Sequence, residues 1–67
     1  MYVTVLDFTE GRVFQYDIWT YELYEVGKEY PTTQQIEDFL VGKGHRMNDC
    51  EWMSHSDWEI ITDKAEI

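Results

Sequence analysis

Apolar and polar side chains alternate along the N-terminal part of the chain, as is typical of β-strands with one buried face. Residues 2–8 and 12–18 are rich in β-branched and aromatic side chains, and runs of this kind favour strands. Residues 9–11 interrupt the pattern as a three-residue turn ending in Gly11, which can take the positive φ that such a turn needs. The pattern therefore predicts an N-terminal β-hairpin.

A helical period replaces this alternation in the middle of the chain. Ile36, Phe39 and Leu40 recur at i, i+3 and i+4 and would form one apolar stripe. Thr32 is followed three residues later by a glutamine, which is the spacing of a capping box at a helix N-terminus. Gly44 comes after the stripe, where glycine commonly ends a helix. We therefore expect a short helix that begins after Thr32.

The last third of the chain predicts a second hairpin. Residues 50–53 and 58–62 resemble strands, with a turn over residues 54–57. Residues 19–30 fit a helix and a strand equally well, because periodicity cannot distinguish the two over so short a segment. The expected fold class is α+β, a single domain over residues 1–67. In it, a small antiparallel sheet of two hairpins, in the order ββαββ, carries one helix packed on one face.

Aromatic residues are the means by which so short a chain can build a core. A chain of 67 residues buries only about 60% of the surface that its unfolded form exposes. Aromatic residues make up 16% of the sequence, and each can bury roughly 150–250 Å². We expect the core to include Phe8, Phe14, Phe39, Leu40 and Trp52.

The charge balance narrows the classes of partner. Fourteen acidic residues stand against five basic ones, which gives a formal net charge of −9 and a pI of about 4.3. Binding to nucleic acid draws on basic side chains that neutralise phosphates, so neither direct nucleic-acid binding nor binding to an anionic membrane is expected. The negative field favours a basic protein partner through electrostatic steering, although solubility alone would also account for it.

Cysteine content and the N-terminus indicate a compartment. The chain has one cysteine, Cys50, so an internal disulfide is excluded and a reducing compartment fits best. Residues 1–7 lack the basic and apolar regions of a signal peptide. No apolar run approaches the roughly 18 residues that a membrane-spanning helix needs. We therefore expect a cytoplasmic protein.

Candidate chemistry centres on Cys50, which lies five residues from both His45 and His55. Zinc sites normally need three or four ligands with closer spacing, and this set lacks a second cysteine. Asp49 and Glu51 flank Cys50 and oppose the thiolate that nucleophilic catalysis requires. A chain of this size also has little volume for a closed pocket. We therefore expect no catalytic residue, no metal and no cofactor, and a protein that is not an enzyme.

The acidic side chains themselves suggest a binding surface. Acids at i and i+2 on one strand face recur about every 6.6–7 Å, close to the separation of neighbouring phosphates along a nucleic-acid strand. An acidic sheet face could therefore imitate DNA and engage a basic, nucleic-acid-binding surface of a host protein. Trp and Tyr, which are enriched at interface hot spots, would contribute. A solvated sheet face is one alternative, and a homo-dimer or larger homo-oligomer with a structural or scaffolding role is another. The expected partner-binding residues are Asp17, Trp19, Tyr21, Glu22, Tyr24, Glu25, Glu29, Glu51, Asp57 and Glu59.

Three segments together form a recognisable set: the hairpin over residues 4–16, the helix with Gly44-His45 after it, and the strand with Trp52-Met53. In these segments the chain resembles small uncharacterised proteins of gut bacteria, their mobile elements and phages. The resemblance covers most of the chain except residues 19–30. It implies the ββαββ fold and a mobile-element origin. Together with the charge of −9 and the aromatic-rich sequence, it suggests a phage or mobile-element anti-defence inhibitor, which would act in the host cytoplasm if phage-encoded. It carries over no catalytic residue.

Overall fold

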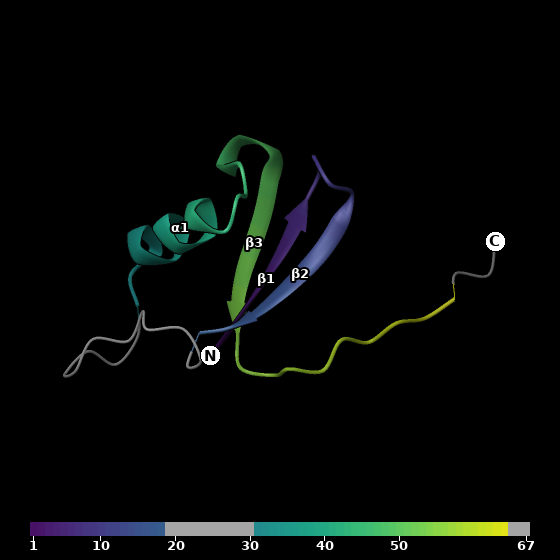
Figure 1. The fold of residues 1–67 in the computed structure, drawn as a ribbon. Coiled ribbons are helices and arrows are strands. Elements are labelled where there is room, and N and C mark those ends of the chain that lie inside the picture. The colour runs from purple at the N-terminus through teal and green to yellow at the C-terminus, as the bar shows by residue number, and fades with distance from the viewer. Residues whose placement is uncertain (19–30, 65–67) are drawn as a thin grey trace.

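A sheet with one helix on one face makes up the described part of the molecule (Figure 1). The computed structural model describes residues 1–18 and 31–64. The predicted α+β class is confirmed. Within the described ranges, no helix is long and apolar enough to cross a membrane. The elements in chain order are β1 (Tyr2–Asp7), β2 (Arg12–Asp17), α1 (Thr33–Gly42), the 3₁₀ turn η1 (Met47–Asp49) and β3 (Cys50–His55).

β1 is the central strand of the sheet. It pairs antiparallel with β2 on one side and with β3 on the other, so the predicted N-terminal hairpin is confirmed. Val5 lies opposite Phe14 on β2 and Trp52 on β3. Residues directly opposite each other point to the same side of a sheet. These three side chains therefore share one face, and that face is the one that α1 covers.

The hairpin turn begins earlier than the sequence indicates. The Asp7 side-chain oxygen Oδ1 accepts hydrogen bonds from the backbone N–H groups of Thr9 at 3.0 Å and Glu10 at 3.1 Å. The Gly11 N–H donates to the Asp7 carbonyl at 2.8 Å, and Gly11 has a φ of 64°. These bonds end β1 at Asp7. Phe8 therefore lies in the loop, 63% exposed, and its predicted place in the core is wrong.

α1 begins where its capping signal lies. The Thr32 hydroxyl accepts from the Gln35 backbone N–H at 3.2 Å, and the Gln35 side-chain oxygen accepts from the Thr32 N–H at 2.8 Å. The two bonds complete the predicted capping box and satisfy two N–H groups that a helix start leaves unpaired. The helix buries Ile36 and Leu40 against the sheet.

The core between α1 and the sheet is mainly aliphatic. Of the five predicted core residues, Leu40 is fully buried, whereas Phe14, Phe39 and Trp52 are partly exposed and pack against the core from its rim. One helix over three strands encloses a narrow space, which branched aliphatic side chains fill while larger rings extend to the edge. Among the described residues, the buried apolar set is Val3, Val5, Ile18, Ile36, Leu40 and Cys50.

Residues 58–62 do not form the predicted fourth strand, so the second hairpin and the ββαββ order are not present in the described chain. β3 continues to His55 and takes β1 as its partner instead. The side-chain amide of Gln15 on β2 then donates to the Trp58 carbonyl at 2.7 Å, which directs the chain across the end of the sheet rather than back along β3. Residues 56–64, here termed the C-terminal arm, run away from the sheet (Figure 1).

Candidate functional site

The face of the sheet that α1 leaves uncovered, here termed the open face, is the first candidate surface. Leu6, Val13 and Met53 are 44%, 58% and 59% exposed on it, and Leu6 lies directly opposite Val13. One end of the open face is therefore an exposed apolar patch. The residues whose side chains share this face are Tyr2, Thr4 and Leu6 on β1, Val13, Gln15 and Asp17 on β2, and Glu51, Met53 and His55 on β3.

The apolar patch contains a hollow of about 230 Å³ lined by Thr4, Leu6, Glu51, Trp52 and Met53. Glu51 is exposed and lies directly opposite Leu6, so a carboxylate stands beside apolar walls. Lys and Arg side chains can bury their apolar stems against apolar surface while the charged end group stays in contact with water or polar atoms. The hollow therefore suits a basic side chain whose stem contacts Leu6 and Met53 and whose head reaches the Glu51 carboxylate.

The other end of the open face is polar, and its side chains contact one another and the nearby backbone through hydrogen bonds and ring stacking. The His55 and Tyr2 rings stack with their centroids 6.1 Å apart. His55 Nδ1 lies 2.7 Å from the Asp57 carbonyl, which can only accept, so Nδ1 carries the proton. His55 Nε2 lies 2.5 Å from the Thr4 hydroxyl oxygen, and this hydroxyl also donates to Gln15 Oε1 at 3.2 Å. Both ring nitrogens of His55 are thus engaged in holding the start of the C-terminal arm.

The predicted acidic residues that lie within the described part of the chain do not lie together on one face. Asp17 and Glu51 lie at opposite ends of the open face, whereas Asp57 and Glu59 lie in the C-terminal arm. The open face therefore carries one acid on β2 and one on β3, beside an apolar patch. The remaining predicted partner-binding residues lie outside the described residues; they are Trp19, Tyr21, Glu22, Tyr24, Glu25 and Glu29.

A second feature lies on the covered face, where Asp7, Tyr16, His45 and Cys50 form a buried polar cluster. Asp7, His45 and Cys50 are 4%, 5% and 7% exposed. His45 Nδ1 lies 2.6 Å from Asp7 Oδ2, and His45 Nε2 lies 2.6 Å from the Tyr16 hydroxyl oxygen. One ligand-type atom from each of Asp7, His45 and Cys50 lies within 4.8 Å of the other two.

The hydrogen bonds of this cluster fix its protons. An ionised carboxylate only accepts, so His45 donates to Asp7 from Nδ1, while its Nε2 is bonded to the Tyr16 hydroxyl. The bond from His45, followed by those from backbone N–H groups, lowers the pKa of the Asp7 carboxyl. Burial, reinforced by the Asp7 charge, raises the pKa of the Cys50 thiol. A thiol that holds its proton is a poor nucleophile.

The end of α1 places His45 in this cluster. Gly44 has a φ of 95°, and its N–H donates to the Val41 carbonyl while the His45 N–H donates to the Leu40 carbonyl, both at 3.0 Å. This pair of bonds is the Schellman motif, which needs a residue of positive φ after the helix. It turns the chain back onto the sheet, where the His45 and Phe14 rings pack in a T-shaped arrangement with their centroids 4.8 Å apart.

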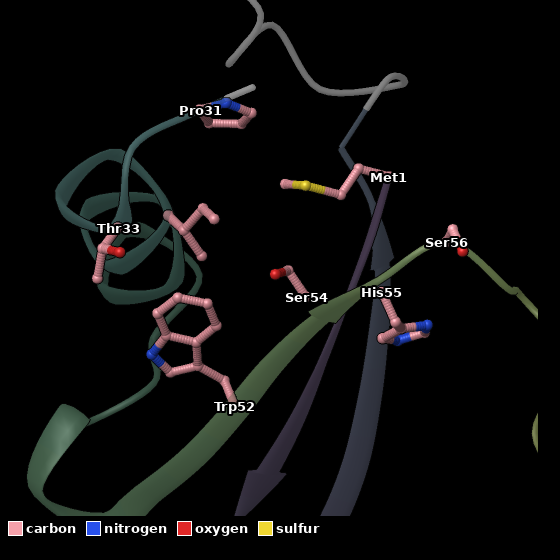
Figure 2. Close-up of a pocket in the computed structure, with 8 residues that line it drawn as sticks. Met1, Pro31, Thr33, Trp52, Ser54, His55 and Ser56 are labelled. Carbon is pink, nitrogen blue, oxygen red and sulfur yellow. The ribbon is translucent and has the colours of Figure 1, made fainter. Parts of the chain in front are cut away.

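A third candidate is a hollow of about 480 Å³ between α1 and the end of β3. Figure 2 shows the Trp52 indole filling the space toward α1, whereas His55 points to the other side of β3. His55 is the only titratable side chain among the described residues that line it, and both its ring nitrogens are already bonded. This hollow therefore offers little chemistry of its own.

Sequence reasoning found two members of the buried cluster and missed the third. His45 and Cys50 come together as candidates, but His55 lies on the open face and Asp7 takes the third place. The local signal at Asp7 is an aspartate ahead of a turn, where its side chain can accept backbone N–H groups. Its neighbourhood with Cys50 depends on the pairing of β1 with β3, which no local pattern reveals.

Comparisons of the chain with protein-family models, with curated proteins and with solved structures find no match. The resemblance to small proteins of mobile elements therefore stays a prediction. The functional conclusion rests on the geometry of the open face and of the buried cluster.

Proposed function

We propose that the chain is a non-enzymatic protein-binding module that docks a basic protein surface on its open face. The observation that carries the proposal is the exposed apolar patch of Leu6, Val13 and Met53 with the Glu51 carboxylate beside it. Apolar patches rimmed by polar residues mark interaction sites on soluble proteins. A net charge of −9 steers basic partners toward this surface and acidic ones away from it.

The hollow beside Glu51 is the expected anchor point. A Lys or Arg of the partner inserts its stem between Leu6 and Met53, and its charged head pairs with the Glu51 carboxylate. The apolar contact supplies affinity, and the ion pair supplies orientation and speed of association. Asp17 and the acids of the C-terminal arm extend the negative field around the contact.

A sharper form of the proposal names the partner as a nucleic-acid-binding protein of a host cell. The chain would then be a phage or mobile-element inhibitor that acts in the host cytoplasm and occupies the site that DNA otherwise fills. The charge of −9 supports this form. Asp17 and Glu51 supply part of the negative surface.

The test is capture of partners from a host lysate at low salt, followed by affinity measurements on the isolated partner. Glu51→Gln and Met53→Ser should each weaken binding about tenfold, which is roughly 1.4 kcal/mol. Glu37→Gln on α1 removes the same charge away from the open face and should leave affinity almost unchanged. Affinity should also fall as salt rises. Equal effects of Glu51→Gln and Glu37→Gln, or binding indifferent to salt, would reject the proposal.

Competition with a DNA duplex tests the sharper form. If the chain occupies a nucleic-acid site, duplex DNA should displace it from the captured partner, and the chain should release DNA from that partner in return. A ternary complex of the chain, the partner and DNA would rule out DNA mimicry while leaving the protein-binding function intact.

A homo-oligomer is the second candidate, and the C-terminal arm favours it. Residues 58–62 have a strand-like sequence but pair with no strand in the described chain. Trp58, Ile60 and Ile61 are 67%, 55% and 87% exposed. Two chains of net charge −9 repel, so self-association should strengthen with salt, opposite to binding of a basic partner. Sedimentation across protein and salt concentration, with Ile60→Asp as the disrupting variant, decides it; a strict monomer in high salt excludes it.

A further inference from the structure

The buried cluster brings together three side chains of the kinds that bind zinc. Zn²⁺ takes cysteine sulfur, histidine nitrogen and carboxylate oxygen as ligands. Asp7 ends β1, His45 lies between α1 and η1, and Cys50 begins β3, yet one ligand atom from each lies within 4.8 Å of the others. We propose that these three residues hold one Zn²⁺ ion, with a water molecule at the fourth position.

Groups around the cluster already orient the three ligands. The backbone N–H groups of Thr9 and Glu10 hold Asp7 Oδ1, which leaves Oδ2 directed at His45. The Tyr16 hydroxyl lies 2.6 Å from His45 Nε2. When Nδ1 binds the ion, the ring proton moves to Nε2 and is donated to the Tyr16 oxygen. Metal sites commonly hold their histidines by such a bond from the second ring nitrogen.

The ion takes the place of the proton between Asp7 and His45. Tetrahedral zinc with bonds of about 2.0–2.3 Å separates its ligand atoms by roughly 3.3–3.8 Å. The Asp7–His45 pair, now 2.6 Å apart, must therefore open by about 1 Å, and His45 can move because it lies in a loop. Cys50 releases its thiol proton to water. The carboxylate and thiolate then balance the charge of Zn²⁺, which suits a buried position.

The position of the cluster gives the ion a structural role. A hollow of about 560 Å³ between the end of α1 and η1 is lined in part by His45, so one of the three ligand residues lies next to an open hollow. A bound ion would tie β1, the loop after α1 and β3 to one another. Small domains with limited cores often depend on a metal of this kind, because the free energy of binding adds to that of folding.

Cobalt titration of the whole chain tests the site, because Co²⁺ occupies zinc sites and has visible and near-ultraviolet absorption. One Co²⁺ per chain should produce the absorption of a tetrahedral ion and a thiolate-to-cobalt charge-transfer band, and Zn²⁺ should abolish both. Free zinc at about 100 times its Kd should raise the Tm by roughly 10–20 °C. Cys50→Ser should lose the charge-transfer band and most of the rise in Tm.

His55→Gln is the matched control, since it removes the other imidazole from the chain without touching the cluster. It should keep the cobalt spectrum, the stoichiometry and the rise in Tm. Absence of the charge-transfer band in the wild-type chain would overturn the proposal even if Cys50→Ser fails to fold. So would loss of the band in His55→Gln, or one ion shared by two chains, because the buried cluster draws all three ligands from one chain.

Discussion

The two faces of the sheet differ sharply although the same three strands build both. On the covered face, Val3 and Val5 have no exposed surface, whereas Leu6 and Met53 on the open face are 44% and 59% exposed. Side chains alternate across a strand, so within the described residues the position of α1 decides which set becomes the core. Stability therefore depends on the covered face, and the apolar residues of the open face are free to serve recognition.

The same substitution in the core between α1 and the covered face, and on the open face, should show this difference most strongly. Leu40→Ala removes a fully buried side chain and should lower the free energy of unfolding by about 2–5 kcal/mol, a large part of the stability of a small domain. Leu6→Ala should cost less than about 1 kcal/mol. Urea denaturation followed by tryptophan fluorescence measures both. Similar losses at the two positions would mean that the open face is also covered in solution.

Acid should lower the stability of the folded state because Asp7, on the covered face, becomes protonated. The folded state lowers the pKa of this carboxyl, so its contribution to stability is present above the ordinary value of 3.8 and is lost as pH falls through the folded pKa. With a chelator present, the Tm of the wild type should exceed that of Asp7→Asn near neutral pH. The gap should narrow in acid below pH 3.8. Asp38→Asn on the exposed side of α1 is the control for loss of one carboxylate, and parallel curves for wild type and Asp7→Asn would contradict this account.

Two glycines at the end of α1 offer the smallest and cleanest contrast. A Cβ added at Gly42 or Gly44 meets no atom within 4 Å, so only the backbone distinguishes them. Gly44→Ala forces alanine into a φ of 95° and should cost about 1–2 kcal/mol, together with some ordering of His45. Gly42→Ala lies in the helix and should stabilise it by up to about 1 kcal/mol. Denaturation curves for the two variants should shift in opposite directions; equal shifts would show that the glycine conformation after the helix is unimportant.

Local signals predicted the parts of the fold that local bonds determine. The capping box at Thr32 and the turn glycine Gly11 both lie where the sequence indicates, because each depends on neighbours within a few residues. Phe8 was misplaced because a side-chain bond from Asp7 moved the start of the turn. That hydrogen bonding ends the strand at Asp7, and the alternation of apolar and polar residues gives no sign of it.

The long-range arrangement escaped sequence reasoning for a different reason. Residues 58–62 have the composition of a strand and are predicted to pair with residues 50–53. In the structure, β3 pairs with β1 instead. The same pairing brings Cys50 opposite Asp7 and so creates the buried cluster. Such pairings depend on the order of strands in the sheet, which an isolated segment does not encode.

The strand order also affects when the domain can fold during its synthesis on the ribosome. The central strand β1 is followed directly by its partner β2, but its other partner β3 is synthesised only after α1 and η1. A lone hairpin is marginally stable in water. The nascent chain therefore stays open until β3 has left the exit tunnel, and the sheet and its helix then fold in one event.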